Sequence, residues 1–215
     1  MFEKNREVVN SIEGLSAQEK EFLYSALNMH GHICGGMPMG YVAGLAALKA
    51  LNAERESNMD KMVIINVGDK HAAGCFADGV QFATGCTFGK GIMKKEAKGK
   101  WTFTLVDKVN GKAVKVKIKP ELLKKAFAAP FITEYRKKGV KPTDVPAEVA
   151  EPGFKRPFTL KLEEIVDVEG PFEFKVPKGK SCFNLEVCES CGDAVAENYL
   201  RVTDGKKICL DCFEY

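Results

Sequence analysis

Two pairs of cysteines in the last part of the printed sequence constrain the folding of this chain more than any other feature. Each pair has the spacing C-x2-C, as in "CESC" and "CLDC", and 17 residues separate the pairs. Because two thiolates on one tight turn can face the same ion, two such turns supply a tetrahedral set of four sulfur ligands, which suits zinc. We therefore predict a structural zinc site, rather than four free thiols, at Cys188, Cys191, Cys209 and Cys212.

The segment around these cysteines predicts a small zinc ribbon over residues 178–215. Between the pairs, the stretches "YLRV" and "KKIC" flank a turn at Asp204-Gly205, which is the pattern of a hairpin. A ribbon of this kind can bind nucleic acid, bind a protein or hold a tail in place. Acidic residues outnumber Lys and Arg over residues 188–215, so nucleic acid is not expected, and a protein partner stays open.

Residues 1–177 are expected to form one core domain. The first stretch, "MFEKNREVVNSIEG", is charged, and no part of the sequence approaches the roughly 18 apolar residues that a membrane span needs. We predict a cytoplasmic protein with no membrane-bound part. Its eight cysteines are then expected to act as metal ligands or reactive thiols rather than as disulfides.

Helical and strand-like patterns alternate in mixed order along this core, which predicts the α+β class with a mixed or antiparallel sheet packed against helices. A hairpin is expected over residues 101–119, where Asn110-Gly111 supplies the turn. A proline-rich stretch, 139–157, predicts an extended connector. The other expected elements are helices over 17–29 and 38–51, a short helix after Asp78, a helix broken at Pro130, and strands over 62–67, 158–168 and 172–177.

Three glycines recur every four residues at and just before the second of these helices, at Gly36, Gly40 and Gly44. Residues four apart lie on one face of a helix, so these glycines form a stripe that another backbone can approach closely. The approach can occur within the chain or across a dimer, and we expect a homodimer through this region.

The loop before that helix places His30, His32 and Cys34 at single-residue spacing. In an extended or irregular loop, side chains at i, i+2 and i+4 face the same way, so these three could converge on one ion. A fourth ligand must then come from elsewhere, and Cys75 is the leading candidate. The alternative is that the histidines only form hydrogen bonds at the helix end and Cys34 is a buried apolar residue. The spacing alone favours neither interpretation.

Two long segments, "HGHICGGMPMGYVAGLAAL" and "CFADGVQFATGCTFGKGIM", resemble the FmdE family, which is named for a component of formylmethanofuran dehydrogenase. Members carry an HGHxCPG loop before a glycine-spaced helix, and later a Thr-Gly-Cys-Thr-x-Gly-Lys-Gly stretch. The resemblance covers about residues 16–120. It implies an α+β core, an intertwined dimer, a metal held at a cleft and, as in many members, a terminal zinc finger.

Carried over residue by residue, the resemblance implicates His30, His32 and Cys34 in the first segment. In the second segment it implicates Cys75, Asp78, Gln81, Thr84, Gly85, Cys86, Thr87, Gly89 and Lys90. Gly35 stands where the family usually has proline, which would loosen the loop. His71 matches nothing in the family, and its position four residues before Cys75 makes it only a weak candidate ligand.

The chemistry of these residues suggests roles at the cleft. Cys34 and Cys75, with His32 or His30, would bind a second divalent metal such as zinc and leave one position for water or a ligand. Asp78 and Gln81 lie one turn apart, so the carboxylate could assist a histidine or accept a proton, and the amide could bind a ligand. Asp78 could instead cap a helix. The candidate catalytic set is therefore Cys34, Cys75, Asp78 and Gln81.

The glycine-rich loop "TGCTFGKG" could bind an anion or a small molecule through its backbone N–H groups. Its candidate residues are Thr84, Gly85, Cys86, Thr87 and Lys90, although Cys86 could equally be a buried structural thiol. The surrounding residues 90–141 hold sixteen Lys or Arg against four acids. This excess could attract an anionic ligand, or it could be the solvated face of a sheet.

These features predict a metalloprotein that acts as an accessory or small-molecule-handling protein in molybdenum or tungsten formylmethanofuran dehydrogenase systems. The alternative is a non-catalytic module that binds a metal, oxyanion or cofactor, or docks on a partner. The sequence contains no molybdopterin or iron–sulfur motif, so it does not support catalysis by this chain alone. Whether the chain is an enzyme is left open.

Overall fold

The computed structural model describes residues 2–69, 71–176, 179 and 181–214. The chain divides into two compact units, a core unit (Met1–Lys175) and a finger unit (Val176–Tyr215). The predicted domain boundary between residues 177 and 178 lies outside the described residues. Among the described residues, no helix combines the length and the apolar character needed to cross a membrane.

The core unit is built on a five-stranded sheet with the order β2-β1-β3-β4-β5. Its β1–β2 pair is parallel and its other pairs are antiparallel. The predicted α+β class is therefore confirmed. The strands are β1 (Lys61–Ile65), β2 (Met93–Lys95), β3 (Thr102–Asp107), β4 (Lys112–Ile118) and β5 (Val166–Glu173).

Alternation of side chains explains why the sheet has one dry face. In β4, Val114, Val116 and Ile118 are buried, while the lysines between them lie on the other face. One of them, Lys117, pairs with Glu169 on the neighbouring strand. The predicted hairpin is confirmed as β3 and β4.

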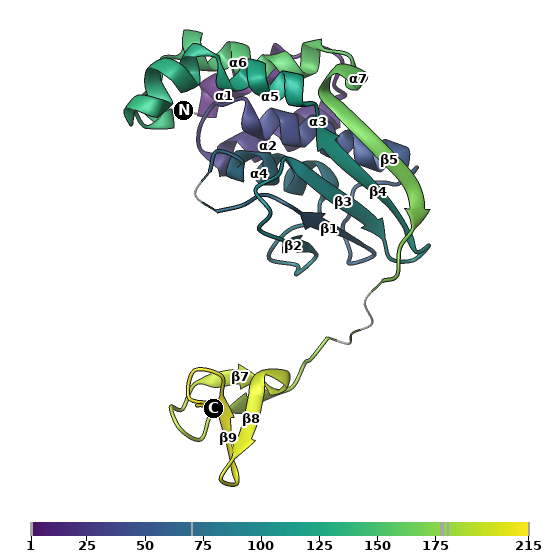
Figure 1. Ribbon diagram of the computed structural model, residues 1–215, viewed down its shortest axis with the longest axis vertical. Coiled ribbons are helices and arrows are strands. Elements are labelled where there is room, and N and C mark those ends of the chain that lie inside the picture. Colours follow the sequence, from purple (N-terminus) through teal and green to yellow (C-terminus); the bar gives the residue numbers. More distant parts are fainter. Residues whose placement is uncertain (1, 70, 177–178, 180, 215) are drawn as a thin grey trace. The chain divides into compact units, whose positions relative to one another are not determined.

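The helices of the core unit lie together on one side of this sheet (Figure 1). They are α1 (Phe2–Asn10), α2 (Ala17–His30), α3 (Gly36–Ala50), α4 (Gly74–Thr84), α5 (Pro120–Phe127), α6 (Ala147–Thr159) and α7 (Leu162–Ile165). Short turns of other helix types follow α5 at Phe131–Tyr135, Arg136–Lys138 and Pro142–Asp144. The predicted break at Pro130 is thus confirmed.

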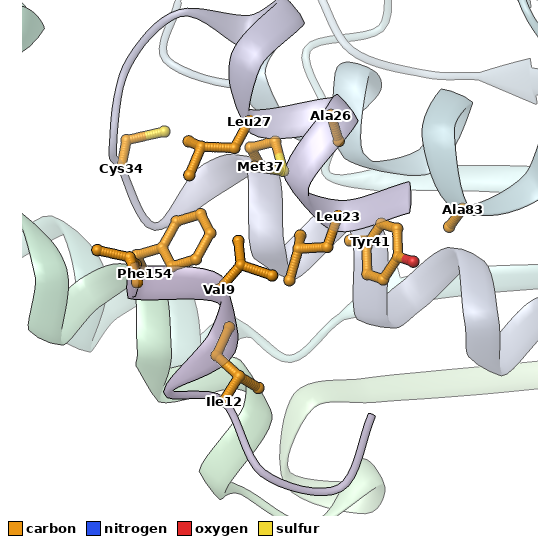
Figure 2. Packing of buried hydrophobic residues seen from close by; sticks show 11 residues of the cluster. Val9, Ile12, Leu23, Ala26, Leu27, Cys34, Met37, Tyr41, Ala83 and Phe154 are labelled. Atoms are coloured by element: carbon orange, nitrogen blue, oxygen red, sulfur yellow. The ribbon is translucent and has the colours of Figure 1, made fainter. Parts of the chain in front are cut away.

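A hydrophobic cluster joins five of these helices, α1, α2, α3, α4 and α6 (Figure 2). Val9, Leu27, Met37 and Phe154 are among its side chains with 1% exposure or less. Burial of each such side chain contributes roughly 1.5–3 kcal/mol. Cys34 belongs to the same cluster, so the loop that carries the histidines is anchored to the core by packing.

Helix α4 of the same chain packs against the glycine stripe. A Cβ on Gly40 would lie 2.0 Å from the Phe76 carbonyl oxygen, and a Cβ on Gly79 would lie 1.9 Å from the Met37 carbonyl oxygen. Helices α3 and α4 can therefore approach closely only because both positions are glycine. Since α4 occupies this stripe, the stripe is not a free surface for the second copy that we expected there.

Two expectations about the segment after Gly139 are wrong. The predicted connector 139–157 contains most of α6, because Ala150, Phe154 and Pro157 follow helical spacing and are buried. In the described part of the predicted strands over 158–168 and 172–177, the structure has the end of α6, then α7 and the single strand β5, which overlaps both ranges; residue 177 lies outside the described residues. In both places tertiary packing overrides the local preference that we inferred from prolines and β-branched residues.

The finger unit contains two small antiparallel sheets. One pairs β6 (Leu185–Val187) with β7 (Ala194–Ala196), and the other pairs β8 (Leu200–Thr203) with β9 (Lys206–Cys209). A short helical turn, Glu197–Tyr199, separates β7 from β8. The β8–β9 pair is the hairpin predicted between the two cysteine pairs.

Candidate metal centre

The end of α2 and the start of α3 position the first three candidate ligands. Helix α2 ends at His30 because Gly31 takes a left-handed conformation with φ of 86°, which residues with a Cβ rarely adopt. The chain then turns through His32 and Cys34 before α3 begins at Gly36. Cys75 comes from the first turn of α4, which packs directly against α3.

Four ligand atoms converge at this point. One atom each from His30, His32, Cys34 and Cys75 lies within 4.8 Å of the other three. His30 Nε2 is 3.5 Å from Cys34 Sγ, and His32 Nε2 is 3.8 Å from Cys75 Sγ. Ligands of one tetrahedral zinc ion lie about 3.3–3.8 Å apart, given the usual bond lengths. These residue types and separations therefore fit a zinc-sized ion.

Asp78 orients the ring of His30 through the ring nitrogen that does not face Cys34. Its Oδ2 atom lies 2.8 Å from His30 Nδ1, so a protonated Nδ1 donates to the carboxylate and leaves Nε2 on the side of Cys34. A carboxylate in this position is a common outer partner of a metal-binding histidine. Asp78 lies inside α4, which begins at Gly74, so the alternative that Asp78 caps this helix is wrong.

The contacts within the cluster shift the pKa values of its side chains. Burial favours a neutral His30, but its hydrogen bonds to Asp78 and Cys75 outweigh burial and raise the pKa of His30 to about 9. The hydrogen bond with Cys75, together with the backbone N–H groups of Met37 and Gly36, lowers the pKa of Cys34. The hydrogen bond with Cys34, together with burial, raises the pKa of Cys75 to about 11.

Close packing surrounds the two glycines that follow Cys34. A Cβ on Gly36 would lie 2.9 Å from Cys75 Cβ and 3.7 Å from the edge of the Trp101 ring, so the indole lies beside the cluster. A Cβ on Gly35 would lie 3.2 Å from the Gly153 carbonyl oxygen in α6. The glycine that replaces the family's proline is thus held against a helix. No sequence motif includes Trp101, and only the packing of α3 reveals its position.

Most other residues of the second segment have partners outside the cluster. Gln81 Oε1 accepts a hydrogen bond from the Phe88 N–H, and Thr84 Oγ1 donates to the Val80 carbonyl and accepts from the Cys86 N–H. Thr87 Oγ1 accepts from the Lys90 N–H.

Further contacts fold this loop against the segment before β1. Lys90 Nζ donates to the Glu56 carbonyl, and Gly85 ends α4 against that same carbonyl. Cys86 is buried, which raises its thiol pKa to about 11. Gly89 has open space around it. These contacts assign the loop residues structural partners within the chain.

His71 stands apart from the four converging residues. Its Nε2 atom accepts a hydrogen bond from the Gly68 N–H at 2.7 Å, and its side chain is exposed. The basic excess over residues 90–141 is partly neutralised, because Lys112, Lys117 and Lys119 pair with acids on β5.

The second cysteine cluster forms the expected set of four in the finger unit. The sulfur atoms of Cys188, Cys191, Cys209 and Cys212 lie within 4.8 Å of one another. Two tight turns support them, with the Gly192 N–H bonded to the Cys188 carbonyl and the Cys212 N–H bonded to the Cys209 carbonyl. Backbone N–H groups of Cys191 and Cys209 point at the Cys188 sulfur and lower its pKa to about 6, which favours the thiolate that a metal binds.

An α+β unit with a His/Cys cluster, joined to a four-cysteine finger, defines a class of metal-binding proteins. Residues 29–167 match the family described as "FmdE, Molybdenum formylmethanofuran dehydrogenase operon". Residues 183–215 match the prokaryotic dksA/traR C4-type zinc finger. The first match spans more than half of the chain, so this chain belongs to the FmdE family and carries a C-terminal C4-type zinc finger.

Two known proteins are similar over most of the chain. A protein of Archaeoglobus fulgidus described as a probable S-adenosyl-L-methionine-binding protein is 29% identical over an alignment of 203 residues, and the match covers 88% of this chain and 52% of the relative. The chain thus spans about half the length of that relative. A tungsten formylmethanofuran dehydrogenase FmdE-like protein from Syntrophus aciditrophicus, whose crystal structure is known, is 22% identical, with a TM-score of 0.56 and 94% of each chain covered. This second likeness shows the fold.

Proposed function

We propose that this chain is an accessory protein that holds two metal ions, one in the finger and a second, zinc or a similar divalent ion, in the core unit. The observation that carries the proposal is the convergence of His30, His32, Cys34 and Cys75 within 4.8 Å. The family's description connects the protein to molybdenum formylmethanofuran dehydrogenase operons. We accordingly propose a role in molybdenum or tungsten systems of that kind.

The donor set favours holding a metal over performing hydrolysis. Two imidazoles and two thiolates would fill a tetrahedral ion, and closed sites of this type are structural rather than catalytic. Gln81 is removed from the candidate catalytic set, because its side-chain oxygen accepts a hydrogen bond from the Phe88 N–H. Asp78 would fix the ring of His30.

The metal content of the purified chain tests this proposal. We expect two metals per chain in the wild type and one in the double variant Cys34→Ser, Cys75→Ser. The matched control is Cys182→Ser, because Cys182 is a thiol outside both converging groups. The control should retain two metals. A double variant that also retains two metals would refute the core site and leave the finger site standing.

Binding of S-adenosylmethionine is a second candidate function. It is favoured by the similarity of 88% of this chain to the probable S-adenosyl-L-methionine-binding protein. Equilibrium dialysis of the full chain with labelled S-adenosylmethionine tests it directly. Saturable binding of one molecule per chain would support the candidate, and the same uptake by a heat-denatured sample would refute it.

Three further statements stay predictions. The homodimer is expected from the family resemblance, and its surface must lie outside the stripe that α4 occupies; sedimentation of the purified chain would measure it. The cytoplasmic location and a protein partner of the zinc finger also stay predictions. Fractionation of cells and affinity capture through the finger would test them.

A further inference from the structure

A small pocket opens beside the candidate metal centre. Its volume is about 140 Å³, and His32 forms part of its wall together with Gly31 and Ile33 from the same loop. The start of α1 and the first residues of α6 close the other sides. Because His32 is also one of the four converging ligands, a molecule in this pocket would lie next to the metal centre.

Within the described part of the chain, the lining of the pocket contains a single Lys or Arg side chain. Lys4 lies there, and among the described residues it makes no ion pair and no Asp or Glu lines the pocket. Asn5 and Thr143 add polar atoms to the wall. An ammonium group without a carboxylate partner selects an anion, and amide and hydroxyl groups can complete the hydrogen bonds of a carboxylate.

The rest of the lining is apolar. Ile33, Val145, Ala147 and Ala150 supply aliphatic surface, and Pro142 adds to it. An apolar cavity of about 150 Å³ is known to hold a molecule the size of benzene, which has six non-hydrogen atoms. A pocket of about 140 Å³ therefore suits a ligand of similar size with one anionic end and a short hydrocarbon part.

We propose that this pocket binds a short-chain monocarboxylate of about four carbons, with its carboxylate toward Lys4 and its hydrocarbon chain against Val145, Ala147 and Ile33. Inorganic anions would pair with Lys4 but leave the aliphatic residues of the lining uncovered. The inference rests on the proposed function in one respect, because a bound metal would fix the ring of His32 that forms part of the pocket wall.

An NMR titration of the full-length, zinc-loaded chain with butyrate tests the proposal. We expect saturable shifts of the His32 and Ala147 signals with a dissociation constant on the order of 1 mM, as suits so small a ligand. Acetate should bind about tenfold more weakly because it lacks two buried methylene groups. Butylamine, which has a similar size and the opposite charge, should cause no saturable shift.

Two pairs of variants connect the binding to this pocket. Ala147→Leu fills it and should weaken butyrate binding at least tenfold, whereas Glu148→Leu places the same side chain at an exposed neighbour outside the lining and should leave binding unchanged. Lys4→Gln should weaken binding about fivefold. Lys49→Gln removes an equal charge from an exposed position on α3 and should have no effect.

The outcomes separate this inference from the proposed function. Two metals per chain without saturable butyrate binding would overturn the pocket assignment and leave the metal proposal intact. One metal per chain, together with butyrate binding that Ala147→Leu abolishes, would overturn the metal proposal and leave the pocket assignment intact. Equal binding of butyrate and butylamine, or equal effects within either pair of variants, would also overturn the assignment.

Discussion

At the scale of single residues, His30 shows how one side chain is shared between structure and chemistry. Its Nδ1 atom faces Asp78 and its Nε2 atom faces Cys34. The side chain is only 5% exposed, so water cannot easily replace either partner. The sequence indicated that Asp78 could assist a histidine, but Asp78 lies 48 positions after His30. Spacing along the chain could not tell which histidine was involved, because that depends on how α4 packs against the loop.

The first prediction concerns the carboxylate behind His30. Replacing Asp78 with alanine removes the hydrogen bond that orients the ring, so the affinity of the core site for zinc should fall about 10- to 100-fold. Competition with a chelator of known affinity measures this change. Asp69→Ala is the matched control, because Asp69 is an exposed carboxylate that pairs with Lys95 instead. Equal zinc affinities of the two variants would contradict a supporting role for Asp78.

At the scale of elements, residues close in sequence were sufficient to predict helix ends and turns. Ser16 and Glu19 form the reciprocal hydrogen bonds of a capping box, and α2 begins immediately after Ser16. The same reasoning failed for α6, because its prolines suggested an extended chain. Phe154 is fully buried in that helix, and the gain from its burial comes from residues distant in sequence. Reasoning from neighbours alone cannot include that gain.

The second prediction concerns the contact between α3 and α4. Gly79→Ala would place a Cβ within 1.9 Å of the Met37 carbonyl oxygen, so the helices must separate. We expect a loss of at least about 3 kcal/mol in the free energy of unfolding, because a shift there disturbs a packed core. Chemical denaturation followed by circular dichroism measures it.

A glycine in the same helix supplies the control for this prediction. A Cβ on Gly74 would meet no heavy atom within 4 Å, and Gly74 has a negative φ. Gly74→Ala should therefore be neutral or stabilise the protein by up to about 1 kcal/mol through helix propensity. Destabilisation of similar size in both variants would show that the close approach of the helices is not the cause.

At the scale of the whole molecule, the two units depend on metal to different extents. The core unit has an extensive hydrophobic cluster, whereas the buried cluster of the finger unit consists of Cys188, Ile208 and Cys209. Chains below about 40 residues rarely fold without a metal, disulfides or a partner. The four cysteines of the finger could be predicted from sequence because their spacing is local. The His/Cys cluster of the core unit could be assembled only partly, since Cys75 comes from α4, whereas His30 and His32 come from the end of α2 and the turn after it.

The last prediction follows from this difference. In the double variant Cys188→Ser, Cys191→Ser the finger should unfold, because structural zinc supplies on the order of 10 kcal/mol or more to small sites of this type. Amide NMR signals of residues 183–214 should collapse to unfolded positions, while signals of the core helices keep their dispersion and the core retains one metal. Cys182→Ser, which alters a thiol outside both clusters, should preserve both sets of signals. A finger that stays folded without zinc would show that its small cluster suffices, and loss of the core signals would show that the core unit cannot fold without the finger.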